Sequence, residues 1–385
     1  MKNEVLIPAA LQICIDDVGW WCGRDDRTIG GPSRTGVDRA GVTRHHCVED
    51  YLALHEFGEA IGQKLYCAFV LGEWDMEDRL GKEIPHFSHF GDRWQNSVHR
   101  SAEGLKKAVE IVNASPYIDV AVHGLYHGYY MDGIVNHDVS DYYYNRNKDD
   151  LTMVPEEEVR LRLDHFFRLY REHGFTKSIN GFVPPTGAYR GFELSSILRD
   201  YGILYNICSF GCLQRFTRIP DTSVLDDVFV DNDLIVVKQQ SAIAAHWWAF
   251  DSDFTESKPS FGVVGLHWPN VLHQEPSRHR ETLVKMVPYF KRCADIFGIV
   301  ISKGIENCAT QELCRKYAKI HETDNAVVID LSNVPNATGR LDYFAVSVRQ
   351  QPASFENCTV KSMEQRDGFI NYELIPCSDV ITVRF

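Results

Sequence analysis

The stretch "LQICIDDVGWW" at residues 11–21 joins a strand-like apolar run to two adjacent carboxylates. Its first five residues are mostly apolar, as in a strand that is buried on both faces of a parallel sheet. The run ends in two adjacent carboxylates, Asp16 and Asp17, and two tryptophans, Trp20 and Trp21, follow closely. Charged side chains directly after a buried strand indicate a site where strands end. We therefore ask which other polar residues follow a strand in the same way.

The composition limits the classes of protein to consider. Of 385 residues, 44% are apolar and 24% are charged, which is typical of soluble globular proteins. The formal net charge of -13 and the lack of a long basic run argue against nucleic acid as a partner. No window reaches roughly 18 consecutive apolar residues, so we expect no membrane span. The N-terminus resembles no signal peptide and the 11 cysteines include no Cys-x-x-Cys, so we expect a cytoplasmic protein with reduced thiols.

Apolar runs of strand length alternate with helical periodicity along most of the chain. The strand-like runs lie at residues 11–15, 65–72, 117–122, 178–183, 203–208, 234–239, 261–266 and 299–302. This alternation predicts an α/β fold, a (β/α) barrel of seven or eight strands that is closed or, if distorted, nearly closed. Residues 325–385 change to short alternating runs such as "YFAVSV" and "VITVRF". They predict a small all-β module after a barrel domain at residues 1–324.

In a (β/α) barrel the reacting groups lie on the loops at the carboxyl ends of the strands. The polar residues and prolines found there are Asp16 and Asp17 after the first strand, Glu73 and Asp75 after the second, His123 and His127 after the third, Pro184 and Pro185 after the fourth, and His267 after residues 261–266. Because these positions recur strand after strand, we expect them to form one site.

The stretch "VHGLYHGYY" places His123 and His127 four residues apart, so that in a helical or turn-like loop both can face one point. Alone, this spacing is a weak signal, since a core or surface pair would look the same. A carboxylate from a neighbouring strand would complete the set of two histidines and one aspartate with an open position that catalytic zinc uses. We therefore expect a divalent metal, zinc first, with nickel, cobalt or manganese as alternatives.

In the order of these motifs the chain resembles the polysaccharide deacetylases, the NodB-homology superfamily of metal-dependent amide hydrolases, as a divergent member. In that superfamily a strand ends in paired aspartates and a later histidine pair supplies two more metal ligands. The resemblance implies that Asp16 is the general base, that Asp17, His123 and His127 are the metal ligands, and that His267 in "GLH" is the general acid. It covers roughly residues 10–305 in motif order, with detailed similarity in short islands.

Two departures from the superfamily pattern set this chain apart. Gly124 follows His123 where the superfamily has Ser or Thr, and "GFVPPTG" has Val183 where an arginine is expected. Arg190, a few residues later, is a candidate replacement. These differences favour a divergent subfamily with its own substrate.

Aromatic residues gather near the same strand ends, and such rings commonly bind sugars or flat heterocycles. Together they favour a ring-shaped, largely uncharged ligand. We expect the substrate to contact Trp20, Trp21, Glu73, Asp75, Pro185, Thr186, Arg190, His246 and Trp268.

The leading hypothesis is a metal-dependent hydrolase of a C–N (amide) bond that acts on a cytosolic N-acylated sugar, a glycan intermediate or a small amide metabolite. A first alternative is a glycoside hydrolase that uses two carboxylates, such as Asp16 and Glu73, without metal. A second is a non-catalytic carbohydrate-binding protein in which residues 325–385 supply contacts or an oligomer interface. A saccharide or other small molecule is the expected partner in each case, and a homo-oligomer is left open.

Overall fold

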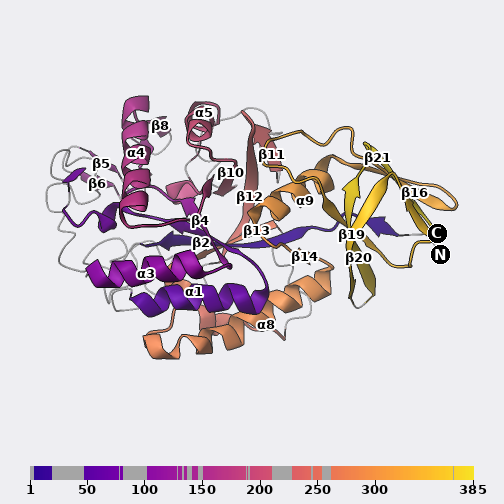
Figure 1. The fold of residues 1–385 in the computed structure, drawn as a ribbon, viewed down its shortest axis with the longest axis horizontal. Coiled ribbons are helices and arrows are strands. Elements are labelled where there is room, and N and C mark those ends of the chain that lie inside the picture. Colours follow the sequence, from indigo (N-terminus) through magenta and orange to yellow (C-terminus); the bar gives the residue numbers. More distant parts are fainter. Residues whose placement is uncertain are drawn as a thin grey trace.

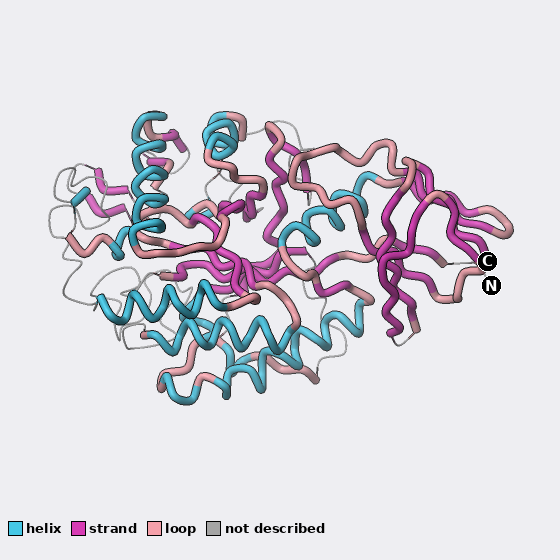
Figure 2. Tube along the Cα trace, viewed as in Figure 1, coloured by secondary structure: helices cyan, strands magenta, loops and turns pink. Residues whose placement is uncertain are grey.

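The structure is a computed structural model that describes residues 4–19, 47–77, 79–80, 102–127, 129–131, 134–136, 141–145, 151–187, 189, 191–209, 228–243, 246–253, 262–366 and 368–385. Figure 1 shows two parts side by side, a barrel wrapped by helices and a smaller group of sheets at the end where both chain termini lie. Figure 2 shows that the helices belong to the first part and that the second is almost entirely strand and loop.

Seven parallel strands form a closed ring, in the order β10-β9-β4-β3-β2-β13-β12, and the pairing of β12 with β10 closes it. The strands are β2 (Ala10–Val18), β3 (Leu65–Phe69), β4 (Ile118–Val122), β9 (Ile179–Phe182), β10 (Tyr205–Ser209), β12 (Leu234–Ile243) and β13 (Gly262–His267). Each coincides with one of the apolar runs, since parallel strands are buried on both faces. The predicted α/β barrel is thereby confirmed, with seven strands and full closure. Two further strands extend it, because β11 (Val228–Asp231) pairs antiparallel with β12 and β14 (Val300–Ile301) pairs with β2.

Helices cover the outside of the ring. In the described part of the chain they include α1 (Val48–Ile61), α3 (Ala102–Ala114), α4 (Glu156–Glu172), α5 (Glu193–Asp200) and α8 (Arg280–Phe297), and the short α7 (Trp268–Val271) follows β13 directly. In Figure 1, α1, α3 and α8 lie together below the strands and α4 and α5 lie above them. Two short hairpins, β5 (Tyr129–Met131) with β6 (Ile134–Asn136) and β7 (Tyr143–Asn145) with β8 (Leu151–Met153), precede α4. None of the described helices combines the length and the apolar composition that a membrane span requires.

The smaller part consists of two four-stranded antiparallel sheets. One contains β1 (Val5–Leu6), β17 (Phe344–Val348), β20 (Phe369–Pro376) and β19 (Cys358–Arg366), and the other contains β15 (Lys319–Glu322), β16 (Ala326–Asp330), β21 (Val380–Arg384) and β18 (Ser354–Glu356). Apolar side chains from both sheets belong to one buried cluster. The C-terminal all-β sheets are thus as expected, but they also include β1 from the N-terminus and β15, which begins before residue 325.

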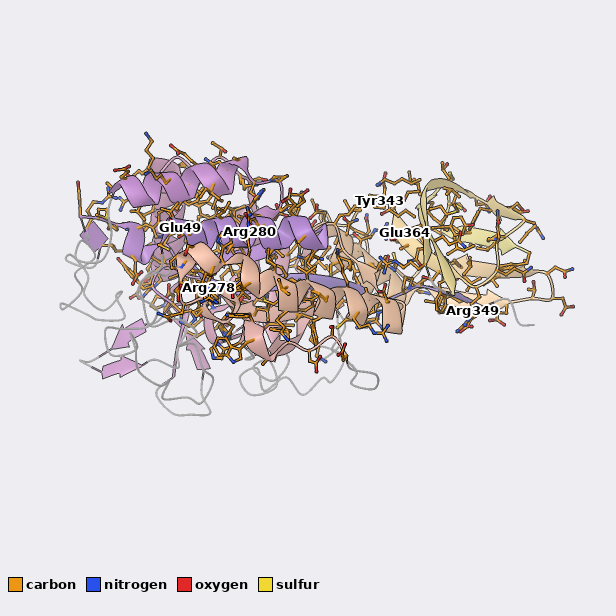
Figure 3. The ribbon with its side chains drawn as sticks, turned by 90° about the horizontal axis from the view of Figure 1, so that it is seen from below. Glu49, Arg278, Arg280, Tyr343, Arg349 and Glu364 are labelled. Carbon is orange, nitrogen blue, oxygen red and sulfur yellow. The ribbon has the colours of Figure 1, made fainter. Side chains whose placement is uncertain are left out.

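Helix α9 (Ile305–Tyr317) lies between the barrel and the two sheets (Figure 1). Gln311 of α9 donates to the carbonyls of Pro8 (2.8 Å) and Ala345 (3.0 Å), and the next residue, Glu312, accepts the N–H of Ala10 at 2.8 Å. A cavity of about 260 Å³ remains beside this helix, and its lining includes Tyr343 and Glu364. Figure 3 shows these two residues on the side of the sheets that faces the barrel. In the described part of the chain, α9 and the two sheets therefore cover the amino end of the barrel.

Candidate metal centre

Asp16 and Asp17 lie on a β-bulge at the end of β2. Successive residues of a regular strand point to opposite faces, so adjacent aspartates would normally be separated by the sheet. Here Ile15 pairs with Cys67 and Val18 pairs with Phe69, so β2 has one more residue than β3 between these two pairs. Asp17, within the bulge, has a left-handed backbone with φ of 66°. The bulge interrupts the alternation, and bulges beside active sites commonly re-aim side chains in this way. The pair of carboxylates can therefore serve one site.

Three buried side chains converge just beyond the strand ends. Asp17 comes from β2, and His123 and His127 come from the loop after β4. The Oδ1 atom of Asp17 lies 3.4 Å from Nε2 of His123 and 3.4 Å from Nε2 of His127. One ligand atom from each of the three lies within 4.8 Å of the others. His127, like Asp17, has a left-handed backbone (φ 65°), and such strained residues persist where a site requires them.

These separations fit the spacing of ligands around a metal ion. A metal about 2.1 Å from each ligand holds neighbouring ligand atoms about 3.4 Å apart in a tetrahedron and about 3.0 Å apart in an octahedron. Both carboxylate–imidazole distances equal the tetrahedral value, and both exceed the usual N–H···O range of about 2.7–3.2 Å. Two imidazoles and one carboxylate also form the donor set that zinc accepts in open, catalytic sites. The residues present therefore fit a divalent metal.

The ring of His123 is oriented by the backbone of a neighbouring strand. Its Nδ1 atom lies 2.7 Å from the carbonyl oxygen of Val183, so Nδ1–H donates to that carbonyl and the other ring nitrogen, Nε2, faces Asp17. Val183 stands where the superfamily resemblance expects an arginine, yet its main chain still supports the site. Burial acts to lower the pKa of His123, but the carboxylates of Asp17 and Asp16 outweigh burial and raise it. Without a metal these carboxylates favour a protonated imidazole, whereas a metal ion among the three ligands would take the place of the Nε2 proton.

The loop that carries the two histidines is organised by Asp141, which the sequence analysis did not select. Its Oδ2 atom accepts the backbone N–H groups of Leu125 and, at 2.8 Å, of Tyr126. Burial raises the pKa of Asp141 to about 6, although Arg162 and the backbone donors, including that of His127, act to lower it. Asp141 precedes the β7–β8 hairpin, so its contact depends on the path of the intervening chain. No local spacing in the sequence marks it.

Asp16 and His267 lie side by side at the rim. They are paired residues of the neighbouring parallel strands β2 and β13, so their side chains lie on the same face of the sheet. Each is 8% exposed, which leaves a small accessible surface beside the buried ligand set. The carboxylate of Asp16 contacts Gln239 and Cys14. The structure thus brings the two residues that the resemblance assigns to proton transfer together at one strand end.

The two carboxylates after β3 lie in and just after η1 (Gly72–Trp74), and both are buried. Asp75 accepts the backbone N–H of Arg79 at 2.9 Å and its Nε–H at 3.1 Å, and it also lies 3.1 Å from Nε2 of His165. Burial acts to raise the pKa of Asp75, but His165 and Arg79 outweigh it and lower the pKa to about 2. These contacts direct Asp75 toward α4. Substrate contacts of Glu73 and Asp75 stay predictions.

The remaining expected substrate residues differ in their surroundings. Pro185 begins η5 (Pro185–Gly187) and lies against Gly124 in the histidine loop. His246, after β12, stacks on Trp248 with ring centroids 4.2 Å apart and planes at 9°, and Trp248 is 52% exposed. Trp268 is fully buried with its ring 4.9 Å from that of Tyr51, so in this structure it belongs to the core.

Some of the expected site falls outside the described part of the chain. This applies to Trp20, Trp21 and Arg190, and to the side chain of Thr186. That Arg190 takes the role of the arginine expected at position 183 therefore stays a prediction.

Comparison with known proteins gives only distant similarities. Neither a protein-family model nor a curated protein sequence matches the chain. A protein described as a polysaccharide deacetylase from Mycobacterium smegmatis is 12% identical with a TM-score of 0.40, and the alignment covers 78% of this chain and 88% of that one. Agd3, a carbohydrate deacetylase, is 11% identical with a TM-score of 0.49, over 98% of this chain and 65% of that one. A 4-alpha-glucanotransferase from Thermococcus litoralis is 13% identical with a TM-score of 0.35, over 77% and 39%. At these scores the similarities decide nothing about function, which must be inferred from the site.

Proposed function

We propose that this chain is a metal-dependent hydrolase of a C–N (amide) bond, of the kind that deacylates N-acylated sugars. The observation that carries the proposal is the convergence of Asp17, His123 and His127, in which both carboxylate–imidazole distances are 3.4 Å and all three ligand atoms lie within 4.8 Å of one another, with Asp16 and His267 beside them. Zinc is the metal we favour, because the donor set is two imidazoles and one carboxylate.

Each residue of the site has a distinct task. When bound, a divalent metal would polarise the amide carbonyl and lower the pKa of water, which is the chemistry that an amide hydrolase needs. Asp17, His123 and His127 hold the metal. Asp16 accepts a proton from the attacking water. His267 donates a proton to the departing nitrogen, because an unprotonated amine is a poor leaving group.

The substrate we propose is a cytosolic N-acylated sugar, a glycan intermediate or a small amide metabolite. The aromatic pair of His246 and Trp248 after β12 supports a ring-shaped ligand, since an exposed indole held flat against a second ring offers a rigid apolar surface. The acidic chain, with a net charge of -13, disfavours a strongly anionic one. We propose a cytoplasmic location as well.

The decisive experiment combines metal analysis with a search for activity. The purified full chain is analysed for metals and assayed for release of acetate, formate and ammonia from N-acetylglucosamine, its oligomers and a set of small cyclic amides. We expect about one zinc per chain and acyl release from at least one acylated sugar. Asp17→Ala should lose the metal, and Asp16→Asn should keep it while turnover falls about 10²- to 10⁴-fold, the usual value of general-base catalysis.

Asp324→Ala, at an exposed position between β15 and β16, is the matched control and should change neither metal content nor turnover. Metal content in Asp17→Ala equal to that of the unsubstituted chain would exclude the proposed centre. Turnover that survives complete removal of metal by a chelator would instead favour the glycoside hydrolase.

A further inference from the structure

The carboxylate of Asp16 contacts a neutral donor at each of its two oxygens. Nε2 of Gln239 lies 3.5 Å from Oδ2, and Sγ of Cys14 lies 3.4 Å from Oδ1. Gln239 is 9% exposed and Cys14 is fully buried. Two donors on opposite oxygens fix the plane of a carboxylate, while its remaining lone pairs stay open to a proton. Neither donor is a metal ligand in the site described above.

Gln239 reaches Asp16 from two strands away. It lies on β12, and β13 stands between β12 and β2. The amide crosses β13 over Gly265, because a Cβ at that glycine would lie 1.6 Å from Nε2 and 2.5 Å from Cδ of Gln239. The pairing of β12 with β13 also shifts register between Gln239 and Ser241. The glycine at position 265 and the register shift together leave room for the Gln239 side chain to reach the Asp16 carboxylate.

The energetics favour a specific role for this contact. A buried amide without a hydrogen bond costs free energy, so Gln239 is retained in the barrel only where it has a partner. A hydrogen bond from a neutral donor to a carboxylate is stronger than one between neutral groups, which helps to offset the side-chain entropy that an ordered glutamine loses. Burial raises the pKa of the Cys14 thiol well above its ordinary value, so Cys14 also donates as a neutral group.

We propose that Gln239 and Cys14 are positioning residues that hold the Asp16 carboxylate at the strand end, and that Gly265 is required because it admits the Gln239 amide. The proposal rests on the proposed function, in which Asp16 accepts the proton of the attacking water. It adds that correct placement of this base depends on two uncharged donors inside the barrel.

The first test uses Gln239→Met, which keeps the length of the side chain and removes the donor. With the acylated sugar of the panel above that is hydrolysed fastest, we expect kcat to fall about 10- to 100-fold, as for a misplaced base, with KM and metal content unchanged. Gly265→Ala should cause a similar loss, because its methyl group displaces the same amide. In the double variant the two losses should not add, since both act through one contact.

Cys14 offers a second pair of variants. Cys14→Ser keeps a donor of similar size and should retain most of kcat, whereas Cys14→Ala should lower it. This rescue separates hydrogen bonding from packing. Thermal unfolding of every variant shows that the barrel is folded.

A structural measurement gives a readout that does not depend on turnover. In crystal structures of the metal-free chain, Gln239→Met should show the Asp16 carboxylate rotated, with Asp17, His123 and His127 unmoved. An unmoved Asp16 carboxylate, or full kcat in Gln239→Met, would overturn the positioning role. If the unsubstituted chain hydrolyses nothing in the panel, the proposed function fails. The positioning role of Gln239 is still tested, because the crystal structure of Gln239→Met shows whether the Asp16 carboxylate has moved.

Discussion

The two ends of the barrel use buried polar side chains in opposite ways. At the amino end, Gln63 directs its amide at three main-chain groups and is saturated by them. At the carboxyl end, the Oδ1 atom of Asp17 lies 3.4 Å from Nε2 of both His123 and His127, and two of the three residues have left-handed backbones. A buried side chain whose hydrogen bonds are all made to the backbone stabilises the fold, whereas several side chains that converge from strained backbone positions are typical of a ligand site. Substitutions at the two ends should therefore change different properties.

The amino end should give the largest effect on stability. Gln63 accepts the N–H of Ile13 at 2.8 Å and donates to the carbonyls of Leu11 (2.7 Å) and Ser302 (2.9 Å). Gln63→Ala would remove three hydrogen bonds to buried main-chain groups, of which the Leu11 carbonyl keeps another partner, the N–H of Ser302 at 3.0 Å. We therefore expect a loss of about 3 kcal/mol in the free energy of unfolding. Denaturant unfolding measures it.

Metal content should be unchanged in Gln63→Ala if the two ends are independent. Gln365→Ala, on the exposed face of β19, is the control and should unfold like the unsubstituted chain. A loss of metal affinity as large as the loss of stability would contradict the separation of the two ends.

A substitution at the carboxyl end of the barrel should change metal affinity. Gly124, between His123 and Leu125, has φ of 85°, and a Cβ there would lie 2.8 Å from Oδ2 of Asp141 and 3.0 Å from Cγ of Pro185. Gly124→Ala therefore strains the loop that carries two ligands. We expect weaker metal binding by about 30-fold, which corresponds to about 2 kcal/mol. Titration with zinc against a chelating dye measures it.

The chain offers a close control for this substitution. Gly174, at the end of α4, has nearly the same φ of 82°, and a Cβ there would meet nothing within 4 Å. Gly174→Ala should cost some stability through the same backbone strain and leave metal affinity alone. Equal losses of affinity in the two variants would mean that strain anywhere in the chain, and not at the site, weakens the metal.

Much of this arrangement follows from sequence patterns. Parallel strands are buried on both faces, so they appear as continuous apolar runs, and reacting groups of a barrel follow them directly. For that reason Asp16, His123 and His267 could be selected from the sequence, and the structure places each of them at the carboxyl end.

Other features depend on register and chain path, which local patterns do not contain. Gln239 reaches Asp16 only because the register of β12 shifts and because residue 265 is a glycine. Asp141 accepts backbone N–H groups of the histidine loop from fifteen or sixteen residues further along the chain. The strand β1 has only two residues, Val5 and Leu6, and pairs with β17 at the far end of the sequence. Such contacts become visible only when the chain is folded.

Asp75 is an intermediate case between the two ends of the barrel. It lies at the carboxyl end, but like Gln63 at the amino end it is held by several hydrogen bonds. Its pKa is lowered to about 2 in the folded chain, mainly because the partners His165 and Arg79 overcome burial. A lowered pKa stabilises the fold fully above the ordinary pKa of about 3.9, and this contribution is lost as the pH falls toward 2. Asp75→Asn removes it at every pH. The two chains should therefore differ by about 2 kcal/mol above pH 5 and converge between pH 4 and pH 2.

The measurement is denaturant unfolding of the metal-free forms, so that loss of metal in acid does not contribute. Asp324→Asn, at an exposed position, should follow the unsubstituted chain throughout. A constant difference between Asp75→Asn and the unsubstituted chain from pH 6 to pH 2 would show that Asp75 contributes through shape and not through charge. If instead the two unfolding free energies converge in acid while metal affinity at neutral pH is unchanged, then Asp75 serves stability alone although it lies near the strand ends. In that case the contacts of a buried polar residue, and not its end of the barrel, show whether it serves stability or metal binding.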